Sequence, residues 1–354
     1  MGESINKVDI LSMTYGELEE YFLNINEKSF RAKQTFKWLH SDRVKTFDEM
    51  SNLSKNLREI LKENTYINNI EAIDVLTSKE DGTKKFLFEL MDGNVIESVF
   101  MRYHHGNSVC ISTQVGCAMG CKFCASTLDG LTRNLTASEM LSQVYEITRI
   151  TGERISNIVL MGSGEPLHNY DNVLKFIELI TDENGYNLSG RNITLSTCGI
   201  VPNIYKLADC KLQITLAISL HSTTDERRKT LMPIANKYSI DEILKATDYF
   251  FERTGRRVSF EYCLVANEND TMEDANRLSK LLSGRNSHVN LIPVNPIKER
   301  DFKSTNMEFV HKFKNVLEKN GINVTIRREM GRDINGACGQ LRKSYIDSKG
   351  GENR

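Results

Sequence analysis

The sequence predicts an α/β fold, an open TIM-like partial (β/α)6 barrel with a small N-terminal helical domain and a hairpin extension. Three observations lead to this prediction. The chain has 354 residues, of which 40% are hydrophobic and 26% charged, as expected of a globular protein of about two domains. Beyond residue 105, short apolar runs alternate with helical stretches, which favours a parallel sheet. The apolar runs number six or seven, fewer than the eight strands of a closed barrel.

The first predicted element is a helical accessory domain over residues 1–68. Between Tyr15 and Lys62, apolar side chains recur at intervals of three and four residues, which is the period of an α-helix. We therefore expect a small group of helices before the first strands.

An antiparallel hairpin extension over residues 69–105 comes next. Two Asp-Gly pairs, Asp81-Gly82 and Asp92-Gly93, separate runs of strand-forming residues. A tight hairpin turn requires positive φ, which glycine adopts readily, so Asp-Gly between such runs is a strong hairpin signal. We expect consecutive hairpins here.

The partial barrel is expected over residues 106–345, followed by a tail at 346–354 that resembles a frayed terminus. In a parallel sheet of this type, the chemistry belongs at the carboxyl ends of the strands. The candidate strands are residues 109–115, 155–161, 192–197, 212–220, 257–265, 288–294 and 323–329.

Charge and hydropathy limit the possible partners. The formal net charge is −1, from 46 basic and 47 acidic residues, but the first hundred residues are net acidic and the remainder is net basic. No run approaches the ~18 apolar residues of a membrane span, and the N-terminus carries acids where a secretory signal would be basic. We therefore expect a cytoplasmic protein. Three basic clusters are typical of solvated helix faces: Arg227, Arg228 and Lys229; Arg253, Arg256 and Arg257; and Arg327, Arg328 and Arg332.

Three of the eight cysteines form the most informative motif in the chain. Cys117, Cys121 and Cys124 have the spacing C-x3-C-x2-C, directly after the first predicted barrel strand. Three thiolates from one loop can bind three irons of a cubane cluster and leave the fourth iron open for a ligand. The alternative is a zinc knuckle, although zinc sites usually show paired C-x2-C units. Its fourth ligand would be His104, His105 or Cys110.

This motif, with Phe123 before its last cysteine, resembles the signature of the radical S-adenosylmethionine (SAM) superfamily. Later motifs narrow the resemblance to the RlmN/Cfr family of RNA adenine methyltransferases, over essentially the whole chain. The resemblance implies a radical SAM barrel with a [4Fe–4S] cluster and two SAM molecules per turnover, one as methyl donor and one as radical source. The motifs are MGSGEPLHNYDN at 161–172, STCGIVP at 196–202, AISLH at 217–221, LIPVN at 291–295 and GRDINGACGQL at 331–341.

The resemblance also assigns the residues that bind the cofactors, with Cys117, Cys121 and Cys124 as the cluster ligands. Gly164 and Glu165 suit the amino end of SAM, because glycine lets the backbone approach a ligand and a carboxylate accepts from an ammonium group. A lone serine or asparagine at a strand end is otherwise more often a helix cap. The implied SAM contacts are Gly164, Glu165, Pro166, Ser196, Ser219, Leu220, His221 and Asn295.

Three further residues carry the chemistry that the resemblance implies. Cys338 is methylated by the first SAM and then delivers the carbon to adenine, whose ring carbons are poor nucleophiles. Cys110 resolves the resulting protein–RNA adduct by forming a transient disulfide with Cys338. Glu97 removes the ring proton, and the alternation over 95–101 places it among apolar neighbours, where burial raises a carboxylate pKa. The alternatives without a catalytic role are a buried structural Cys338 and a solvent-facing Glu97. The resemblance assigns no role to Cys198, Cys210 or Cys263, and these three are expected in the core.

Within the family, Pro166 and the RREMG run at 327–331 resemble the RlmN branch more than the Cfr branch. This predicts methylation of adenine C2 at position 2503 of 23S rRNA and at position 37 of tRNA. The alternatives are a Cfr-like adenine C8 methyltransferase, a radical SAM enzyme with another outcome, or a non-catalytic zinc-containing RNA-binding protein. The expected partners are RNA, contacted through Arg31, Lys33 and Lys37, and a one-electron reductant such as flavodoxin or ferredoxin, with the chain as a monomer. Asn335, Gly336 and Ser163 depart from the family pattern, and we expect the added backbone freedom at Gly336 to alter how the loop that carries Cys338 moves.

Overall fold

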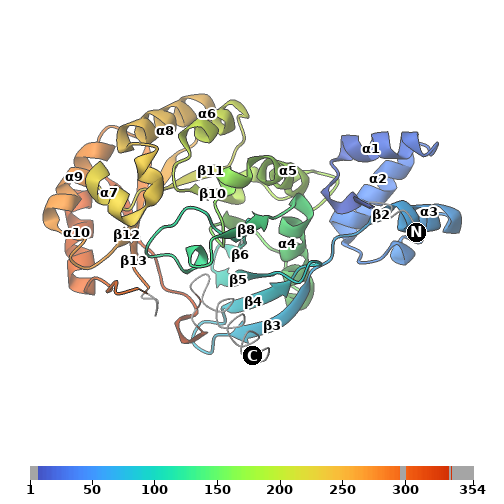
Figure 1. The fold of residues 1–354 in the computed structure, drawn as a ribbon, viewed down its shortest axis with the longest axis horizontal. Coiled ribbons are helices and arrows are strands. Elements are labelled where there is room, and N and C mark those ends of the chain that lie inside the picture. The colour runs from blue at the N-terminus through green and yellow to red at the C-terminus, as the bar shows by residue number, and fades with distance from the viewer. Residues whose placement is uncertain (1–6, 296–299, 335, 337–354) are drawn as a thin grey trace.

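The computed structural model describes residues 7–295, 300–334 and 336, and Figure 1 shows its fold. A ten-stranded sheet forms the centre of the molecule, and the N-terminal helices lie at one end of it. Leu18 and Phe36 of these helices belong to the same buried apolar cluster as Leu160 and Leu216 of the sheet. The N-terminal helices and the sheet therefore share one hydrophobic interior.

The N-terminal region is helical, as the apolar periodicity predicts. Its first helix, α1, starts with a capping box, in which Thr14 and Glu17 each accept a hydrogen bond from the other's backbone N–H. A π-helical turn, Lys37–Asp42, follows α2 and ends at Arg43 in the left-handed region, with φ 57°. The elements are β1 (Val8–Asp9), η1 (Ile10–Ser12), α1 (Tyr15–Asn24), α2 (Phe30–Phe36), η2 (Lys37–Asp42), η3 (Phe47–Glu49), α3 (Lys55–Asn64) and β2 (Thr65–Tyr66).

The two predicted hairpins are present and join β3 (Glu71–Thr77), β4 (Lys84–Glu89) and β5 (Val95–Tyr103). Gly82 and Gly93 have φ values of 73° and 79° in the two turns, as the Asp-Gly signal requires. Strand β5 also pairs antiparallel with the first barrel strand, β6. The extension is therefore continuous with the barrel sheet.

The predicted parallel sheet is confirmed. In the described part of the chain, the strand order is β14-β13-β12-β11-β10-β9-β6-β5-β4-β3, and the pairs from β6 to β14 are all parallel. The sheet is open, because its two edge strands, β14 and β3, do not pair with each other. The parallel strands are β6 (Gly106–Cys110), β9 (Asn157–Leu160), β10 (Ile193–Thr197), β11 (Thr215–Ser219), β12 (Val258–Leu264), β13 (Ser287–Pro293) and β14 (Asn323–Ile326).

Helices connect the parallel strands, and Figure 1 shows α6, α8, α9 and α10 along the outer side of the sheet. None of the helices in the described ranges has the length and apolar character that a membrane crossing requires. The α-helices are α4 (Ala137–Thr151), α5 (Tyr170–Thr181), α6 (Val201–Asp209), α7 (Asp225–Leu231), α8 (Ile240–Thr254), α9 (Met272–Leu282) and α10 (Met307–Lys319). Short 3-10 turns are η4 (Ala125–Thr127), η5 (Pro166–Asn169), η6 (Gly190–Asn192), η7 (Pro233–Asn236) and η8 (Arg332–Ile334).

One predicted strand, 109–115, is divided in the structure. The chain leaves the main sheet after Ile111, because the backbone N–H of Ser112 donates to the side chain of Gln143 on α4 instead of to a neighbouring strand. Residues Gln114–Gly116 then form β7, which pairs with β8 (Leu131–Asn134) in a separate two-stranded sheet. The cysteine loop therefore begins from this small ribbon rather than from a long barrel strand.

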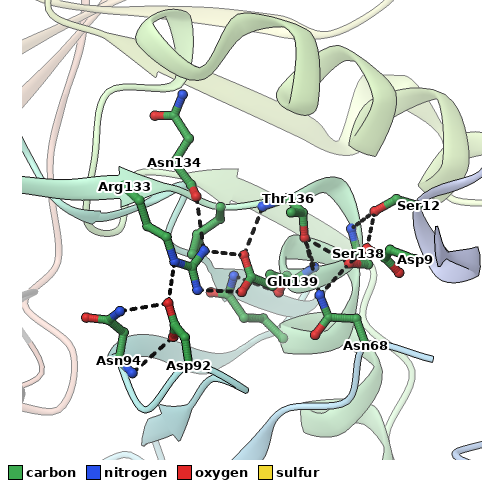
Figure 2. A network of polar contacts seen from close by, with 12 residues as sticks. Asp9, Ser12, Asn68, Asp92, Asn94, Arg133, Asn134, Thr136, Ser138 and Glu139 are labelled. Atoms are coloured by element: carbon green, nitrogen blue, oxygen red, sulfur yellow. Dashed lines mark hydrogen bonds and ion pairs between the residues drawn. The ribbon is translucent and has the colours of Figure 1, made fainter. Parts of the chain in front are cut away.

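Polar contacts hold this ribbon in place. Figure 2 shows Arg133 of β8 between Asp92 of the β4–β5 turn and Glu139 of α4, with nitrogen-to-oxygen distances of 2.6 and 2.8 Å. Farther along the same network, Ser138 contacts Asp9 and Ser12 of the N-terminal segment. The hairpin extension, the N-terminal region and the ribbon that leads into the cysteine loop are thus joined by hydrogen bonds.

Candidate active site

A cavity of about 280 Å³ lies where the carboxyl ends of the parallel strands meet. Residues at or just beyond the ends of β9, β10, β11, β12 and β13 line it, together with the cysteine loop. This is the edge of a parallel sheet at which ligand sites are expected. Most of the residues that the sequence nominates are brought together here.

The three cysteines of the motif, Cys117, Cys121 and Cys124, all line this cavity. Burial raises the pKa of each thiol, to about 12 for Cys117, and the proximity of the other cysteines raises the pKa of Cys117 and Cys121 further. Positive charge is therefore needed to hold the three as thiolates, and bound iron would supply it. Among the described residues, no three His, Cys, Asp or Glu side chains converge closely enough to hold a single metal ion. The donor set fits a cubane cluster, in which each cysteine binds a different iron.

The cysteine loop has a fixed start. The backbone N–H of Cys117 donates to the carbonyl of Gly130 at 2.9 Å. A Cβ at Gly116, which has φ 76°, would lie 2.0 Å from that same carbonyl oxygen, so only glycine allows the approach. The tight β7–β8 ribbon thus sets where the first cysteine enters the cavity.

Phe123, the aromatic residue of the motif, packs against His221. The two rings meet edge to face with centroids 4.8 Å apart. His221 lies just beyond β11 in the left-handed region, with φ 54°, and its Nδ1 accepts the backbone N–H of Cys263 at 2.9 Å. Burial lowers the pKa of His221 to about 3, so the ring is neutral and carries its proton on Nε2. The cavity therefore contains an imidazole N–H donor that does not change with physiological pH.

Gly164 and Glu165 form a rigid corner after β9. A Cβ at Gly164, φ 110°, would lie 2.6 Å from Cβ of Gln114, and the Gln114 side chain accepts the N–H of Glu165 at 2.9 Å. The Glu165 carboxylate accepts backbone N–H groups of Leu167 and Cys198, at 2.9 and 2.7 Å. Burial raises the pKa of Glu165, and these hydrogen bonds oppose the rise. The carboxylate is held rigidly at the cavity wall, where it can accept from an ammonium group.

The remaining predicted SAM contacts divide into two groups. Ser196, Ser219 and Asn295 line the cavity, whereas Pro166 and Leu220 do not. Pro166 is the first residue of the η5 turn, and the backbone of Leu220 pairs with β12 through the carbonyl of Glu261. These two residues support the cavity wall rather than facing the space.

Glu97 is buried, with 1% of its side chain exposed, so the solvent-facing alternative is wrong. The expectation that its neighbours are only apolar needs correction. The Nζ of Lys85, from the adjacent strand β4 and itself 0% exposed, lies 3.2 Å from Oε2 of Glu97. Sequence reasoning missed this lysine, although a lysine within the apolar run KKFLFE was a usable signal.

Cys110 lies beside Glu97 and next to the cavity. It pairs with Val99 in the β5–β6 register and belongs to an apolar cluster that includes Met161, a cavity-lining residue. Burial raises the pKa of the Cys110 thiol to about 11, while the positive charges of Arg327 and Lys85 oppose the rise. Cys110 and Glu97 therefore share one charged environment at the side of the cavity.

The other cysteines correct a simple expectation of core positions. Cys198 and Cys263 are buried, but both line the cavity. Cys210 is exposed at the end of α6, where its sulfur lies 3.6 Å from the hydroxyl of Tyr170. Cys338 and Asn335 lie outside the described residues. Gly336 is described, and a Cβ there would lie 2.5 Å from the carbonyl oxygen of Met330, so the departure to glycine permits a close turn.

Arg228 is the most important residue that sequence reasoning missed. It belongs to a basic cluster expected on a solvated helix face, yet its side chain is 0% exposed. Its guanidinium donates to the backbone carbonyls of Cys198, Ser219 and Leu220, at 2.6, 3.2 and 3.1 Å. The guanidinium of Arg228 thus links the carboxyl ends of β10 and β11, which line the cavity.

Comparison with known families gives two matches along the chain. Residues 8–67 match the N-terminal domain of the ribosomal RNA large subunit methyltransferase RlmN. Residues 111–278 match the radical SAM superfamily, and this range contains the cysteine motif, Gly164, Glu165 and His221. The two matches therefore cover the N-terminal helices and most of the parallel sheet.

Individual proteins match over nearly the whole chain. A probable dual-specificity RNA methyltransferase RlmN of Lachnospira eligens is 62% identical over 339 residues, which cover 96% of this chain and 97% of that protein. The corresponding protein of Clostridium perfringens strain 13 is 59% identical over 342 residues, covering 97% and 99%. The crystal structure of a radical SAM methyltransferase from Sphaerobacter thermophilus superposes with a TM-score of 0.90 at 39% identity, covering 94% of this chain and 98% of that one.

Proposed function

The chain belongs to the RlmN family of radical SAM RNA methyltransferases, and from this premise we propose that it methylates C2 of adenine in 23S rRNA and in tRNA. Family membership confirms the resemblance seen in the sequence, with a [4Fe–4S] cluster and SAM as cofactors. It also removes the alternative of a non-catalytic zinc-containing protein. The observation that carries the proposal is the cavity, where the cysteine motif, Glu165 and His221 meet beside Cys110 and Glu97.

The cavity residues have distinct tasks. Cys117, Cys121 and Cys124 would hold the cluster, and Glu165 with the strand-end residues Ser196, Ser219 and Asn295 would bind SAM. When bound, these groups supply a 5′-deoxyadenosyl radical. Neutral His221 offers an N–H donor, and Phe123 fixes its ring. The rigid hydrogen bonding of Glu165 keeps an acceptor in position without reorganisation.

Glu97 and Cys110, which lie beside the cavity, would act on the RNA base together with Cys338. Glu97 accepts the proton from C2, and the ion pair with Lys85, at 3.2 Å, holds its carboxylate in place. The thiolate of Cys110 attacks the sulfur of Cys338, so that a disulfide forms and the bond from sulfur to the methylene carbon breaks. The electron pair of that bond stays on the carbon, which takes up a proton to become the methyl group. Lys85 and Arg327 favour the Cys110 thiolate that this attack needs.

The N-terminal domain would contact the RNA. Lys33 and Lys37 are exposed four residues apart, on α2 and at the start of η2, so they lie on one helical face. Arg31 is half-buried and donates to Gln34 and to the carbonyl of Asn52, which holds it at the same end of the helix. Phosphate contacts from these side chains would make RNA binding dependent on salt.

Nucleoside mass spectrometry tests the proposed carbon and substrates. Ribosomal RNA and tRNA from a strain that lacks the gene are compared with RNA from the same strain complemented by the wild-type gene or by Cys338→Ala. We expect 2-methyladenosine to be lost from both RNAs and to be restored only by the wild type. Loss of 8-methyladenosine instead would show the Cfr-like activity and contradict the proposal.

The role of Cys110 has its own test. We expect Cys110→Ala to accumulate a covalent protein–RNA adduct, because the thiol that releases Cys338 from the base is missing. Denaturing electrophoresis with labelled RNA measures the adduct, and Cys210→Ala, at the exposed cysteine, serves as the matched control. RNA-free Cys110→Ala protein with normal turnover would refute the assigned role.

A further inference from the structure

Arg228 holds a positive charge inside the protein at the wall of the cavity. The residue lies on α7, and its guanidinium donates to three backbone carbonyls at 2.6 to 3.2 Å. These carbonyls belong to Cys198, Ser219 and Leu220, so they come from the ends of β10 and β11. Carbonyl oxygens solvate the guanidinium, but they do not neutralise it.

No carboxylate in the described ranges forms an ion pair with Arg228, and its Nη1 is buried without a hydrogen-bond partner there. Asp225, on the same helix, attracts it only at longer range, since its carboxylate accepts the N–H of Ile240. A guanidinium does not lose its proton in proteins. Because burial of an uncompensated charge costs several kcal/mol, the site needs an anion that these residues do not supply.

The cysteine loop lies directly against the helix that carries Arg228. The backbone N–H of Lys122, next to Cys121, donates to the carbonyl of Leu231 at the end of α7, at 2.9 Å. Leu231 and Met232 pack with Cys121 and Cys198 in one buried apolar cluster.

We propose that Arg228 is the buried counter-ion of the [4Fe–4S] cluster and that its charge raises the reduction potential of the cluster. The inference rests on Cys117, Cys121 and Cys124 as the cluster ligands. A cubane with three thiolates is anionic and gains a further negative charge on reduction, so a fixed cation nearby favours the reduced form. Arg228 is thus a positioning residue that eases the delivery of an electron to the cluster, and it also fixes the strand ends that face SAM.

Redox titration of the anaerobically purified holoenzyme, followed by electron paramagnetic resonance of the reduced cluster, tests the inference. We expect Arg228→Met to lower the equilibrium constant for reduction of the cluster at least tenfold. For a one-electron couple, this corresponds to a fall of 59 mV in the midpoint potential. Arg228→Lys retains the charge and is expected to recover more than half of this shift. Lys229→Met removes an exposed cation from the same helix and serves as the control that leaves the potential unchanged.

Three results would overturn the inference. The first is a folded, iron-loaded Arg228→Met protein with the wild-type potential. The second is an Arg228→Lys protein whose midpoint potential falls by the full 59 mV. This result would refute the role of the charge even if the methionine variant does not retain iron. The third is weaker SAM binding at unchanged potential, which would make Arg228 a partner of the SAM carboxylate instead. The titration needs no RNA, so its result is independent of which adenine carbon is methylated.

Discussion

Lys85 and Arg228 are both completely buried cations, but the protein treats them differently. Lys85, in the antiparallel extension, lies 3.2 Å from the carboxylate of Glu97. Arg228, on α7 of the parallel barrel, donates hydrogen bonds only to carbonyl oxygens in the described part of the chain. Glu97 compensates the charge of Lys85, whereas no acid among the described residues forms an ion pair with Arg228. A buried cation without an acid among its contacts therefore points toward a bound anion, and one with an acid points toward proton chemistry or stability.

The largest effect should follow from removal of the carboxylate in the compensated pair. Glu97→Gln keeps the shape of the side chain but cannot accept the C2 proton. We expect the single-turnover rate of RNA methylation to fall roughly 10²- to 10⁴-fold, the usual contribution of a general base. Glu89→Gln, on β4 and half-buried, is the matched control and should keep its activity. A folded Glu97→Gln enzyme with a near-normal rate would show that the Lys85–Glu97 pair is structural.

Removal of the cation from the same pair should act mainly on stability. Lys85→Met leaves the Glu97 carboxylate buried without its ion-pair partner, so we expect the free energy of unfolding to fall by about 3–5 kcal/mol. Chemical denaturation measures this loss. Lys84→Met, at the preceding and less buried position of β4, should change stability by less than about 0.5 kcal/mol.

The double variant sharpens this prediction. Lys85→Met combined with Glu97→Gln removes both charges, and replacement of a whole buried pair is often close to neutral. We expect it to be more stable than Lys85→Met alone. Additive losses from the two single changes would mean that the two side chains are not coupled.

His221 differs from both Lys85 and Arg228, because this buried basic group remains neutral. Its folded pKa of about 3 lies below the ordinary value of 6.5, so below pH 6.5 the unfolded chain binds a proton that the folded protein excludes. Stability is therefore lost as the pH falls, by roughly 2 kcal/mol from this residue between pH 7 and pH 5.

Unfolding free energies of wild type and His221→Gln across this pH range measure the contribution. We expect the variant to lose less stability than the wild type on acidification, by roughly 2 kcal/mol at pH 5. His40, in η2 of the N-terminal region, is also buried, with a pKa lowered to about 3. We expect His40→Gln to reduce the loss of stability on acidification in the same way. Parallel pH profiles of the wild type and His221→Gln would contradict a neutral buried His221.

Much of the fold was predictable because its signals are local. The Asp-Gly pairs specify positive φ at Gly82 and Gly93, and both hairpins form there. Apolar runs mark the parallel strands, since these are covered on both faces. The prediction of one continuous strand over 109–115 was wrong, because the backbone N–H of Ser112 donates to the side chain of Gln143 instead of continuing the ladder. That partner is more than thirty residues away and carries no local signal.

The candidate site shows the same division. By itself, the sequence determined the cysteine motif, the strand-end glycine and carboxylate and the family, because each depends on residues that are close along the chain. Tertiary structure alone decided which cations are buried and which of them lies against an acid. Lys85 meets Glu97 only through the register of β4 and β5, and Arg228 is buried only because α7 packs over the ends of β10 and β11. Electrostatic compensation depends on distances of a few ångströms between segments far apart in sequence, and those distances are set by packing.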